Sequence, residues 1–280
     1  VNGNLLGFVQ YGSGFDDRAF DCASTSDGGI LTVGYGWQEM TERDRVLGGL
    51  PLNTGNSTFS MVKINSDGSL GWQRHMDIGD YDDMAFSMVK KTDGTFLVLG
   101  RQHGSAGKYL TLVHVNESGT ILGTFSYNQI FVGGETLYGV DIIQAQYGGF
   151  YILAMDGYDF VNRNDPYEFR GLGSNCYVIK LDASLNYVFA KDISFSRPAF
   201  TVNRMMAYEI TQASDGDLAL VGYIRSESPG GGGPGLQFDA FLIELDALGN
   251  FKGSRYFDFA GTDRAIPMAI ETIETGYVIA

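Results

Sequence analysis

The chain of 280 residues carries 39 glycines but only 6 prolines, 44% of it is apolar, and its net charge is −14. The glycine and apolar content favours many short strands joined by tight turns over a disordered or helical chain. The negative charge repels phosphate backbones and anionic lipid, which excludes nucleic acid as an expected partner, and no apolar run approaches the ~20 residues that a transmembrane helix needs.

The first predicted strand covers residues 5–11. Its pattern matches the outermost strand of a four-stranded unit whose other three strands lie elsewhere in the chain. We therefore predict that residues 1–11 form a closing outer strand. Because Val1 leads directly into this strand, we expect the chain to be a mature or partial product.

A repeated module begins after this strand. The segment from Asp17 to Gly34, two β-rich runs around an Asp-Gly-Gly turn, returns from Asp83 to Gly100 around Asp-Gly-Thr. Weaker copies cover residues 139–154 and 207–222, and a fifth copy opens at Asp263. Paired runs around such turns predict β-hairpins.

A second hairpin module alternates with the first. Its third strand ends in Asn or Asp at residues 65, 116, 182 and 246, which are 51, 66 and 64 residues apart. The two modules together predict four strands per repeat, as in residues 85–91, 96–102, 110–115 and 121–127 of the second repeat. Four-stranded antiparallel units at this period are typical of propeller blades.

We predict an all-β fold, a β-propeller of four-stranded antiparallel blades with four complete repeats and a partial fifth, in one domain spanning 1–280. The repeat units are 12–76, 77–130, 131–195, 196–257 and the partial unit 258–280. An open blade edge is an aggregation hazard. We therefore expect a fragment of a larger propeller, with further blades from the intact protein or from another chain.

The segment from Phe238 to Asn250, which reads FDAFLIELDALGN, and the later Gly261-Thr-Asp-Arg-Ala265 resemble the bacterial seven-bladed β-propeller repeat family (SBBP-type repeats). The matching residues shape strands and turns, so the resemblance implies a fold rather than a catalytic residue. It further implies a secreted or cell-surface protein of adhesion-like role. The repeats at residues 139 and 207 depart from the family pattern, because they lack the Asp before Ala.

The links that carry the candidate site are those from the fourth strand to the next first strand and from the second strand to the third. Propellers place both kinds of link on one face, and loops on a rigid scaffold concentrate function. The first kind is acidic, and we select Asp17, Asp83 and Asp263 as ligand-binding candidates. They predict either a Ca²⁺ or cationic-partner site or carboxylates that cap their own turns.

The second kind includes three long insertions, at 38–57, 156–175 and 225–237. Their aromatic residues are suited to protein or sugar contact, although they could instead pack back on the blade rim. The aromatic candidates are Trp37, Tyr158, Phe160, Tyr167 and Phe169.

Neither the cysteines nor the histidines form a recognisable site in the sequence. Cys22 and Cys176 fall at strand positions that other repeats fill with apolar residues, which predicts buried side chains and no disulfide between them. His75 and His103 have no evident partner pattern, and His114 occupies an ordinary polar strand position. We assemble no metal triad and no Ser-His-Asp arrangement, and expect no cofactor other than a possible Ca²⁺.

The leading hypothesis from the sequence is a non-catalytic extracellular or cell-surface propeller, a structural interaction module that binds a protein or glycan at the long-loop face, within a larger assembly. The alternative is a glycan-active hydrolase or lyase that uses acidic residues at the axial funnel. It requires two carboxylates about 5 to 10 Å apart around one cavity.

Overall fold

The computed structural model describes residues 11, 17–38, 56–76, 78, 83–104, 107–127, 137–156, 175–193, 201–227, 237–257, 267–274 and 276–280. The chain divides into two compact units, Val1–Tyr127 and Asn128–Ala280. Every regular element in these ranges is a β-strand, so none of them contains a helix suited to crossing a membrane.

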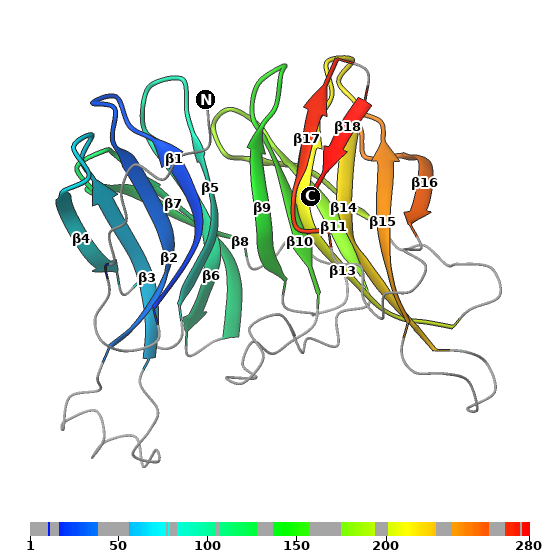
Figure 1. Cartoon of the computed structure of the whole chain (residues 1–280), viewed down its shortest axis with the longest axis horizontal. Helices are drawn as coiled ribbons and strands as arrows, with labels where there is room; N and C mark the ends of the chain where they lie inside the picture. Colours follow the sequence, from blue (N-terminus) through cyan, green and yellow to red (C-terminus); the bar gives the residue numbers. More distant parts are fainter. Residues whose placement is uncertain are drawn as a thin grey trace, which may run out of the picture. The chain divides into compact units, whose positions relative to one another are not determined.

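The first unit contains two four-stranded antiparallel sheets among its described residues (Figure 1). Sheet A runs in the order β1 (Arg18–Ser24), β2 (Ile30–Gln38), β3 (Asn56–Ile64) and β4 (Leu70–Met76). Sheet B runs in the order β5 (Met84–Lys90), β6 (Phe96–Gly104), β7 (Gly107–Val115) and β8 (Ile121–Tyr127). Strands adjacent in the chain are adjacent in each sheet, which confirms the predicted blade.

The second unit repeats this arrangement within its described ranges. Sheet C consists of β9 (Tyr138–Gln144), β10 (Phe150–Met155), β11 (Cys176–Leu181) and β12 (Tyr187–Asp192). Sheet D consists of β13 (Thr201–Gln212), β14 (Leu218–Glu227), β15 (Gln237–Leu245) and β16 (Phe251–Phe257), and sheet E pairs β17 (Ile270–Ile273) with β18 (Gly276–Ile279). Four complete blades and the start of a fifth therefore follow the predicted repeats. Of the predicted closing strand, the structure describes Tyr11 alone, whose hydroxyl donates to the Gly68 carbonyl at 2.9 Å.

The hairpins within each blade share one turn geometry. In the turn after β1, the Gly28 N–H donates to the Thr25 carbonyl and the Thr25 N–H donates to the Gly29 carbonyl. The fourth turn residue has positive φ, which glycine adopts without steric cost. The turn between β11 and β12 is the exception among the described hairpins, because Leu185 occupies this position at φ 65°.

The substitution Leu185→Gly is expected to stabilise the protein. A left-handed conformation costs an L-residue other than glycine about 1–2 kcal/mol, partly offset by the larger entropy of glycine in the unfolded chain, so we expect a net gain of about 1 kcal/mol. Urea unfolding of the variant measures this gain. Ala183→Gly, in the same turn but without positive φ, is the matched control and should not stabilise the protein; equal midpoints for Leu185→Gly and the parent would contradict the strain.

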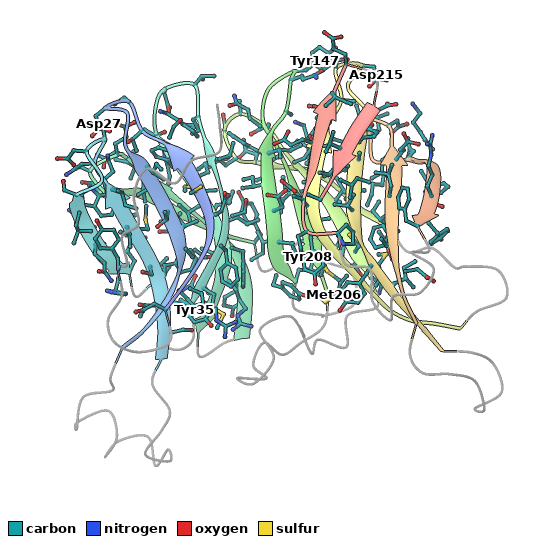
Figure 2. The ribbon with its side chains drawn as sticks, in the orientation of Figure 1. Asp27, Tyr35, Tyr147, Met206, Tyr208 and Asp215 are labelled. Atoms are coloured by element: carbon teal, nitrogen blue, oxygen red, sulfur yellow. The ribbon has the colours of Figure 1, made fainter. Side chains whose placement is uncertain are left out.

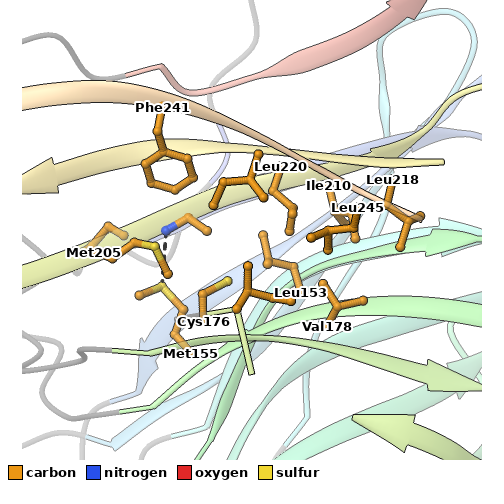
Figure 3. Packing of buried hydrophobic residues seen from close by; sticks show 14 of the residues in the cluster. Leu153, Met155, Cys176, Val178, Met205, Ile210, Leu218, Leu220, Phe241 and Leu245 are labelled. Carbon is orange, nitrogen blue, oxygen red and sulfur yellow. Dashed lines mark hydrogen bonds between the residues drawn. The ribbon is translucent and has the colours of Figure 1, made fainter. Parts of the chain in front are cut away.

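Apolar cores form between consecutive sheets. In the first unit, Leu31, Val33, Phe59 and Met61 of sheet A pack against sheet B residues that include Phe96. In the second unit, sheets C and D enclose a larger cluster (Figure 3). Its labelled members are Leu153, Met155, Cys176, Val178, Met205, Ile210, Leu218, Leu220, Phe241 and Leu245. A third cluster joins sheet D to Ile270 of sheet E, so within the two units the pairs A and B, C and D, and D and E each share a buried apolar interface.

An acidic side chain connects the first strands of consecutive sheets. In the first unit the Asp21 carboxylate accepts the Met88 N–H of β5 at 2.7 Å, in addition to the Cys22 N–H of its own strand at 2.6 Å. In the second unit Asp141 accepts the Ile210 N–H at 2.9 Å, and Glu209 accepts the Ile270 N–H at 2.6 Å. We call these contacts the inner-strand links.

The links supply acceptors that a sheet edge lacks. Strands β5, β13 and β17 are each the first strand of their sheet, so one row of their N–H groups has no strand partner within that sheet. The linking acids follow β-bulges, between Ala19 and Asp21 in β1 and between Ala207 and Glu209 in β13. A bulge re-aims the side chains on either side of it. The bulge and the acid together therefore set the position of the next blade.

Loss of an inner-strand link is expected to destabilise the protein strongly. Asp141→Ala removes a charged acceptor from two backbone N–H groups, and hydrogen bonds to charged groups contribute about 1.5–3 kcal/mol each. We expect a loss of about 2–3 kcal/mol in the free energy of unfolding, measured by denaturant titration. Glu271→Ala, which removes an exposed acid from β17, should stay within about 0.5 kcal/mol of the parent, and equal losses in both variants would refute the role of the link.

Candidate functional site at the loop end of the blades

Each blade has two distinct ends, which we call the turn end and the loop end. The turn end carries the tight hairpins, such as the one with Asp27 in the first unit (Figure 2). The loop end carries the links from second to third strands, which span residues 39–55, 105–106, 157–174 and 228–236. Three of these links are long and one is short, as predicted, and all four lie outside the described residues.

Aromatic side chains gather at the loop end of the first unit. The ring of Phe20 lies 5.8 Å from the ring of Tyr35 and 5.7 Å from that of Phe86, measured between centroids. The Arg18 guanidinium carbon lies 5.9 Å from the centre of the Tyr35 ring. Tyr35 and Phe86 are buried, whereas Phe20 is 39% exposed. We call these four residues the Phe20 patch. The partly exposed ring of Phe20 packs on two buried rings, and the guanidinium of Arg18 lies beside them.

Asp17 and His75 meet beside a glycine at the same end of sheet A. A Cβ at position 36 would lie 2.8 Å from Asp17 Oδ1 and 2.8 Å from His75 Nδ1, so both groups flank the space that Gly36 leaves open. The Gln73 amide nitrogen lies 3.0 Å from His75 Nε2, and Thr58 Oγ1 lies 3.5 Å from Nδ1. The two ring nitrogens of His75 therefore lie within hydrogen-bonding distance of Gln73 and Thr58. Asp17 and His75 are half-buried.

Asp83 has a different environment from Asp17, although both precede the first strand of a blade. Its side chain is fully buried, and its Oδ2 accepts the Ile78 N–H at 2.8 Å. The Ile78 carbonyl in turn accepts the Gln102 side-chain amide at 2.8 Å. This geometry agrees with the turn-capping interpretation of the acidic links and places the Asp83 carboxylate away from solvent.

The second unit carries tyrosines at the corresponding position. The Tyr208 ring, at the bulge of β13, lies 6.0 Å from the Tyr223 ring. Burial, together with the neighbouring Tyr223 and Tyr138 and the hydrogen bond with Tyr223, raises the pKa of Tyr208 above its ordinary value. The Tyr208 phenol therefore remains neutral at physiological pH and can donate a hydrogen bond. Figure 2 shows Tyr208 and Met206 in this unit, far from Asp215 at its turn end.

The base of the 157–174 link is held by a buried carboxylate. Asp156 accepts the Asn175 N–H at 2.9 Å and the Asn175 side-chain amide at 2.6 Å, while its own N–H donates to the Asn175 carbonyl at 3.2 Å. The Tyr177 hydroxyl lies 3.5 Å from the same carboxylate. The two ends of the link are thus fixed, whatever contacts the link itself makes.

Carboxylates at the turn end perform a structural role. Asp182 and Asp246 each accept N–H groups two and four residues later along the chain, and Asn116 makes the same contacts in the second blade. These bonds, with the Asn186 and Asn250 side-chain amides contributing most, lower the pKa of both aspartates. Where a carboxyl pKa shift is resolved in the described ranges, hydrogen bonds lower it; the carboxyls concerned are Asp27, Asp67, Asp93, Glu117, Asp182 and Asp246.

Polar residues of the third strands also reach these turns. Lys63 Nζ lies 2.9 Å from Asp27 Oδ1, His114 Nε2 lies 2.7 Å from Thr95 Oγ1, and Lys180 Nζ donates to the Gly148 carbonyl at 2.7 Å. The prediction that His114 is an ordinary polar position agrees with this contact. Among the residues that the structure describes, no group of three or more His, Cys, Asp or Glu side chains could hold a metal ion.

The prediction for the two cysteines is half correct. Cys176 is buried between sheets C and D, and burial, assisted by Asp192 and Asp156, raises the pKa of its thiol. Cys22 was predicted to be buried and is exposed, because it lies on the face of sheet A opposite to the one that packs on sheet B. Both thiols are free, as expected.

Several predicted site residues lie outside the described part of the chain. Asp263, Tyr158, Phe160, Tyr167 and Phe169 belong to this group, and for Trp37 the structure gives only the backbone, which pairs with Ser57. Sequence reasoning missed Phe20 and His75. Phe20 could have been found as the extra residue before Asp21, since two other first strands, β5 and β13, place Phe86 and Tyr208 there. The position of His75 is occupied by Ser126, Asp192 and Tyr256 in the other complete blades, so no repeated histidine marked it.

No family model matches the chain, and no curated protein matches it. Solved structures similar in fold include a putative glycoside hydrolase from Parabacteroides distasonis (10% identity, 95% of this chain and 83% of that chain, TM-score 0.53). Others are an endo-arabinase from Bacteroides thetaiotaomicron (13% identity, 79% and 80%, TM-score 0.48) and a thermostable family-43 glycoside hydrolase (9% identity, 96% of each chain, TM-score 0.49).

The blades and the Parabacteroides structure together define the fold of this protein as a β-propeller. At this level of identity the likeness concerns the fold alone. The resemblance of the repeats to the SBBP-type family is supported as far as the propeller fold, while no family model matches.

The space at Gly36 is expected to control how Asp17 and His75 are placed. In Gly36→Ala the new methyl group would lie 2.6 Å from His75 Cε1, so the imidazole must move away from Gln73 and Thr58. We expect a change in the ¹⁵N shifts of the His75 ring nitrogens and a loss of about 1–3 kcal/mol in stability from overpacking. In the control Gly253→Ala, the nearest atom is Glu244 Oε2 at 3.7 Å, and neither quantity should change; an unmoved His75 signal in Gly36→Ala would contradict the geometry.

Proposed function

We propose that this protein is a glycan-active β-propeller that binds carbohydrate at the loop end of its blades. The observation that carries the proposal is the Phe20 patch, in which a partly exposed aromatic ring rests on two buried rings beside Arg18. Asp17 and His75 lie on the same blade at the same end. Sugar rings combine an apolar C–H face with hydroxyl groups, and this surface offers a partner for each.

The proposal has two forms, hydrolysis of a glycosidic bond and binding without catalysis. We place hydrolysis first, because the Parabacteroides structure that shares the fold is described as a putative glycoside hydrolase. A shared fold does not supply a function, so this is a reason to test hydrolysis before binding rather than a demonstration of it.

Hydrolysis would require two carboxyl groups facing one sugar, one of them with a raised pKa. Of the carboxylates predicted from the sequence, Asp17 lies half-buried at the loop end. His75 flanks the same space at Gly36. The second carboxyl would have to lie about 5 to 10 Å from Asp17. Asp83 is not suited to the role, because it is fully buried and bonded to the Ile78 N–H.

Binding without catalysis is the second form. It is favoured by the engagement of described carboxylates in backbone hydrogen bonds, as at Asp83, Asp156 and Asp182. Such groups are acceptors in rigid turns rather than proton donors. In this form the loop end presents a glycan- or protein-binding surface within a larger assembly. We extend both forms of the proposal to an extracellular or cell-surface location, where such glycans are available.

The experiment is a panel of oligosaccharides scored for binding by calorimetry and for cleavage by release of reducing ends. We expect Phe20→Ala to weaken binding about three- to tenfold, since an aromatic contact contributes about 0.5–1.5 kcal/mol. If the protein is a hydrolase, Asp17→Asn should lower kcat about 100-fold or more with little change in KM. Binding that survives in Asp17→Asn without any cleavage by the parent protein would select the non-catalytic form.

Asp67→Asn is the matched control for the carboxylate. Asp67 lies at the turn end of the same blade, where it accepts the Ser69 N–H at 2.9 Å, and Asn116 shows that an asparagine can make such turn contacts. The control should leave binding and cleavage unchanged. Carbohydrate affinity that is insensitive to Phe20→Ala, or absent across the panel, would refute the proposal.

A further inference from the structure

The aromatic pair at the centre of the Phe20 patch has a counterpart in the second unit. The Phe20 ring lies 5.8 Å from the Tyr35 ring at an interplanar angle of 43°, and the Tyr208 ring lies 6.0 Å from the Tyr223 ring at 39°. In each pair, the residue left unpaired by the first-strand bulge contacts a tyrosine of the second strand in the same sheet. The two pairs are therefore built in the same way, one in sheet A and one in sheet D.

The backbone beneath the two pairs is also equivalent. Gly34 and Gly222 each come directly before the tyrosine of the second strand. At either glycine a Cβ would collide with a carbonyl oxygen of the first strand, that of Arg18 or that of Met206. The two strands thus approach each other closely at both bulges, and a bulge re-aims the side chain that it carries. Because the backbones agree, the two places differ only in their side chains.

The other two complete blades do not repeat this pair. In sheet B the bulge residue is Phe86 and Arg101 takes the place of the second-strand tyrosine, while in sheet C the two positions hold Val140 and Met155. Val140 and Tyr208 pack against the same apolar cluster, so packing at this place does not require a phenol. Tyr208 is half-buried, so part of its side chain is accessible to a ligand.

The two pairs differ in charge and in hydrogen bonding. Arg18 lies 5.9 Å from the centre of the Tyr35 ring, whereas Met206 stands at the position of Arg18 in sheet D. The hydroxyl of Tyr208 shares a hydrogen bond with Tyr223, and burial raises the pKa of Tyr208, so its phenol stays neutral. An aromatic ring with a neutral hydroxyl suits a ligand that offers C–H groups and hydroxyl groups but no charge.

We propose that Tyr208 and Tyr223 form a second carbohydrate-binding site, in which an uncharged sugar residue packs on the Tyr208 ring and hydrogen-bonds to its hydroxyl. The inference rests on the proposed function, because it extends carbohydrate binding from the Phe20 patch to the equivalent pair of the second unit. A sugar fits better than an apolar peptide segment, since an apolar side chain would cover the phenol without giving it a hydrogen bond.

The test is a calorimetric titration of the protein with the uncharged cellotetraose, xylotetraose and mannotetraose and with the acidic tetragalacturonate. For an uncharged ligand, Tyr208→Phe should weaken binding about two- to tenfold, because only the hydroxyl bond is lost. Tyr208→Ala should weaken it about tenfold or more, because the ring contact is lost as well. In the parent protein with ¹³C-labelled tyrosine, the ring signal of Tyr208 should shift during the titration, and this shift should persist in Phe20→Ala.

Tyr151→Phe is the matched control. It removes a phenol whose pKa burial also raises, at the turn end of the same two sheets, where the hydroxyl donates to the Ala247 carbonyl at 2.7 Å. Binding should be unchanged in this variant, and losses equal to those of Tyr208→Phe would overturn the inference by showing a general effect on stability.

The variants also separate the inference from the proposed function. Weaker binding in Phe20→Ala with unchanged binding in Tyr208→Ala would overturn the inference and leave the proposed function intact. Weaker binding in Tyr208→Ala with unchanged binding in Phe20→Ala would support the second site and refute the role of the Phe20 patch. A loss in Tyr208→Ala that is confined to tetragalacturonate would overturn the assignment of an uncharged sugar, and absence of binding by all four oligosaccharides would overturn both proposals.

Discussion

The inner-strand link is the interaction on which the rest of each unit depends. A blade begins with an edge strand, and an edge strand exposes N–H groups that must find acceptors. Asp21, Asp141 and Glu209 supply those acceptors from the preceding blade and thereby set the register between sheets. The bulge beside each acid also places one extra residue at the loop end. Phe20 and Tyr208 are such residues, so the geometry that joins the blades is also the geometry that presents the aromatic surface.

Much of this fold could be predicted from the sequence because its information is local. Each signal consists of a few neighbouring residues and returns in the other repeats. Examples are the turn residues Asp27-Gly28 and the acidic end of a third strand at Asp246. Features that depend on distant packing could not be predicted in this way. Leu185 departs from the glycine of the other turns although Asp182 makes the same bonds as Asp246, whose turn has Gly249, so no neighbouring residue marks the departure. Cys22 matches its buried counterparts in sequence, yet its exposure depends on which sheet covers it.

The candidate site shows why equivalent positions need not have equivalent roles. Asp17 and Asp83 occupy the same place in the repeat, but the second blade has Gln102 where the first has Gly36. The Gln102 side chain fills that space and bonds to the Ile78 carbonyl and to Ser126, the counterpart of His75. In the first blade the glycine leaves room for an imidazole and a carboxylate. Comparison of the repeats in sequence could locate the position of Asp17. It could not predict the space beside Gly36, because that space is bounded by residues from separate strands of the blade.

The two ends of the blades differ in how closely their residues follow the repeat. At the turn end, Asn116, Asp182 and Asp246 make the same bonds in successive blades, so this end offers a ligand the same surface repeatedly. At the loop end the blades differ, with Phe20 in one unit, Tyr208 in the other and links of unequal length between second and third strands. The two ends therefore differ in how far their residues follow the repeat: contacts of the turn end recur from blade to blade, whereas the loop end carries residues particular to one blade. The inner-strand links lie beside the bulges that carry Phe20 and Tyr208, so the contacts that join consecutive sheets also position these residues.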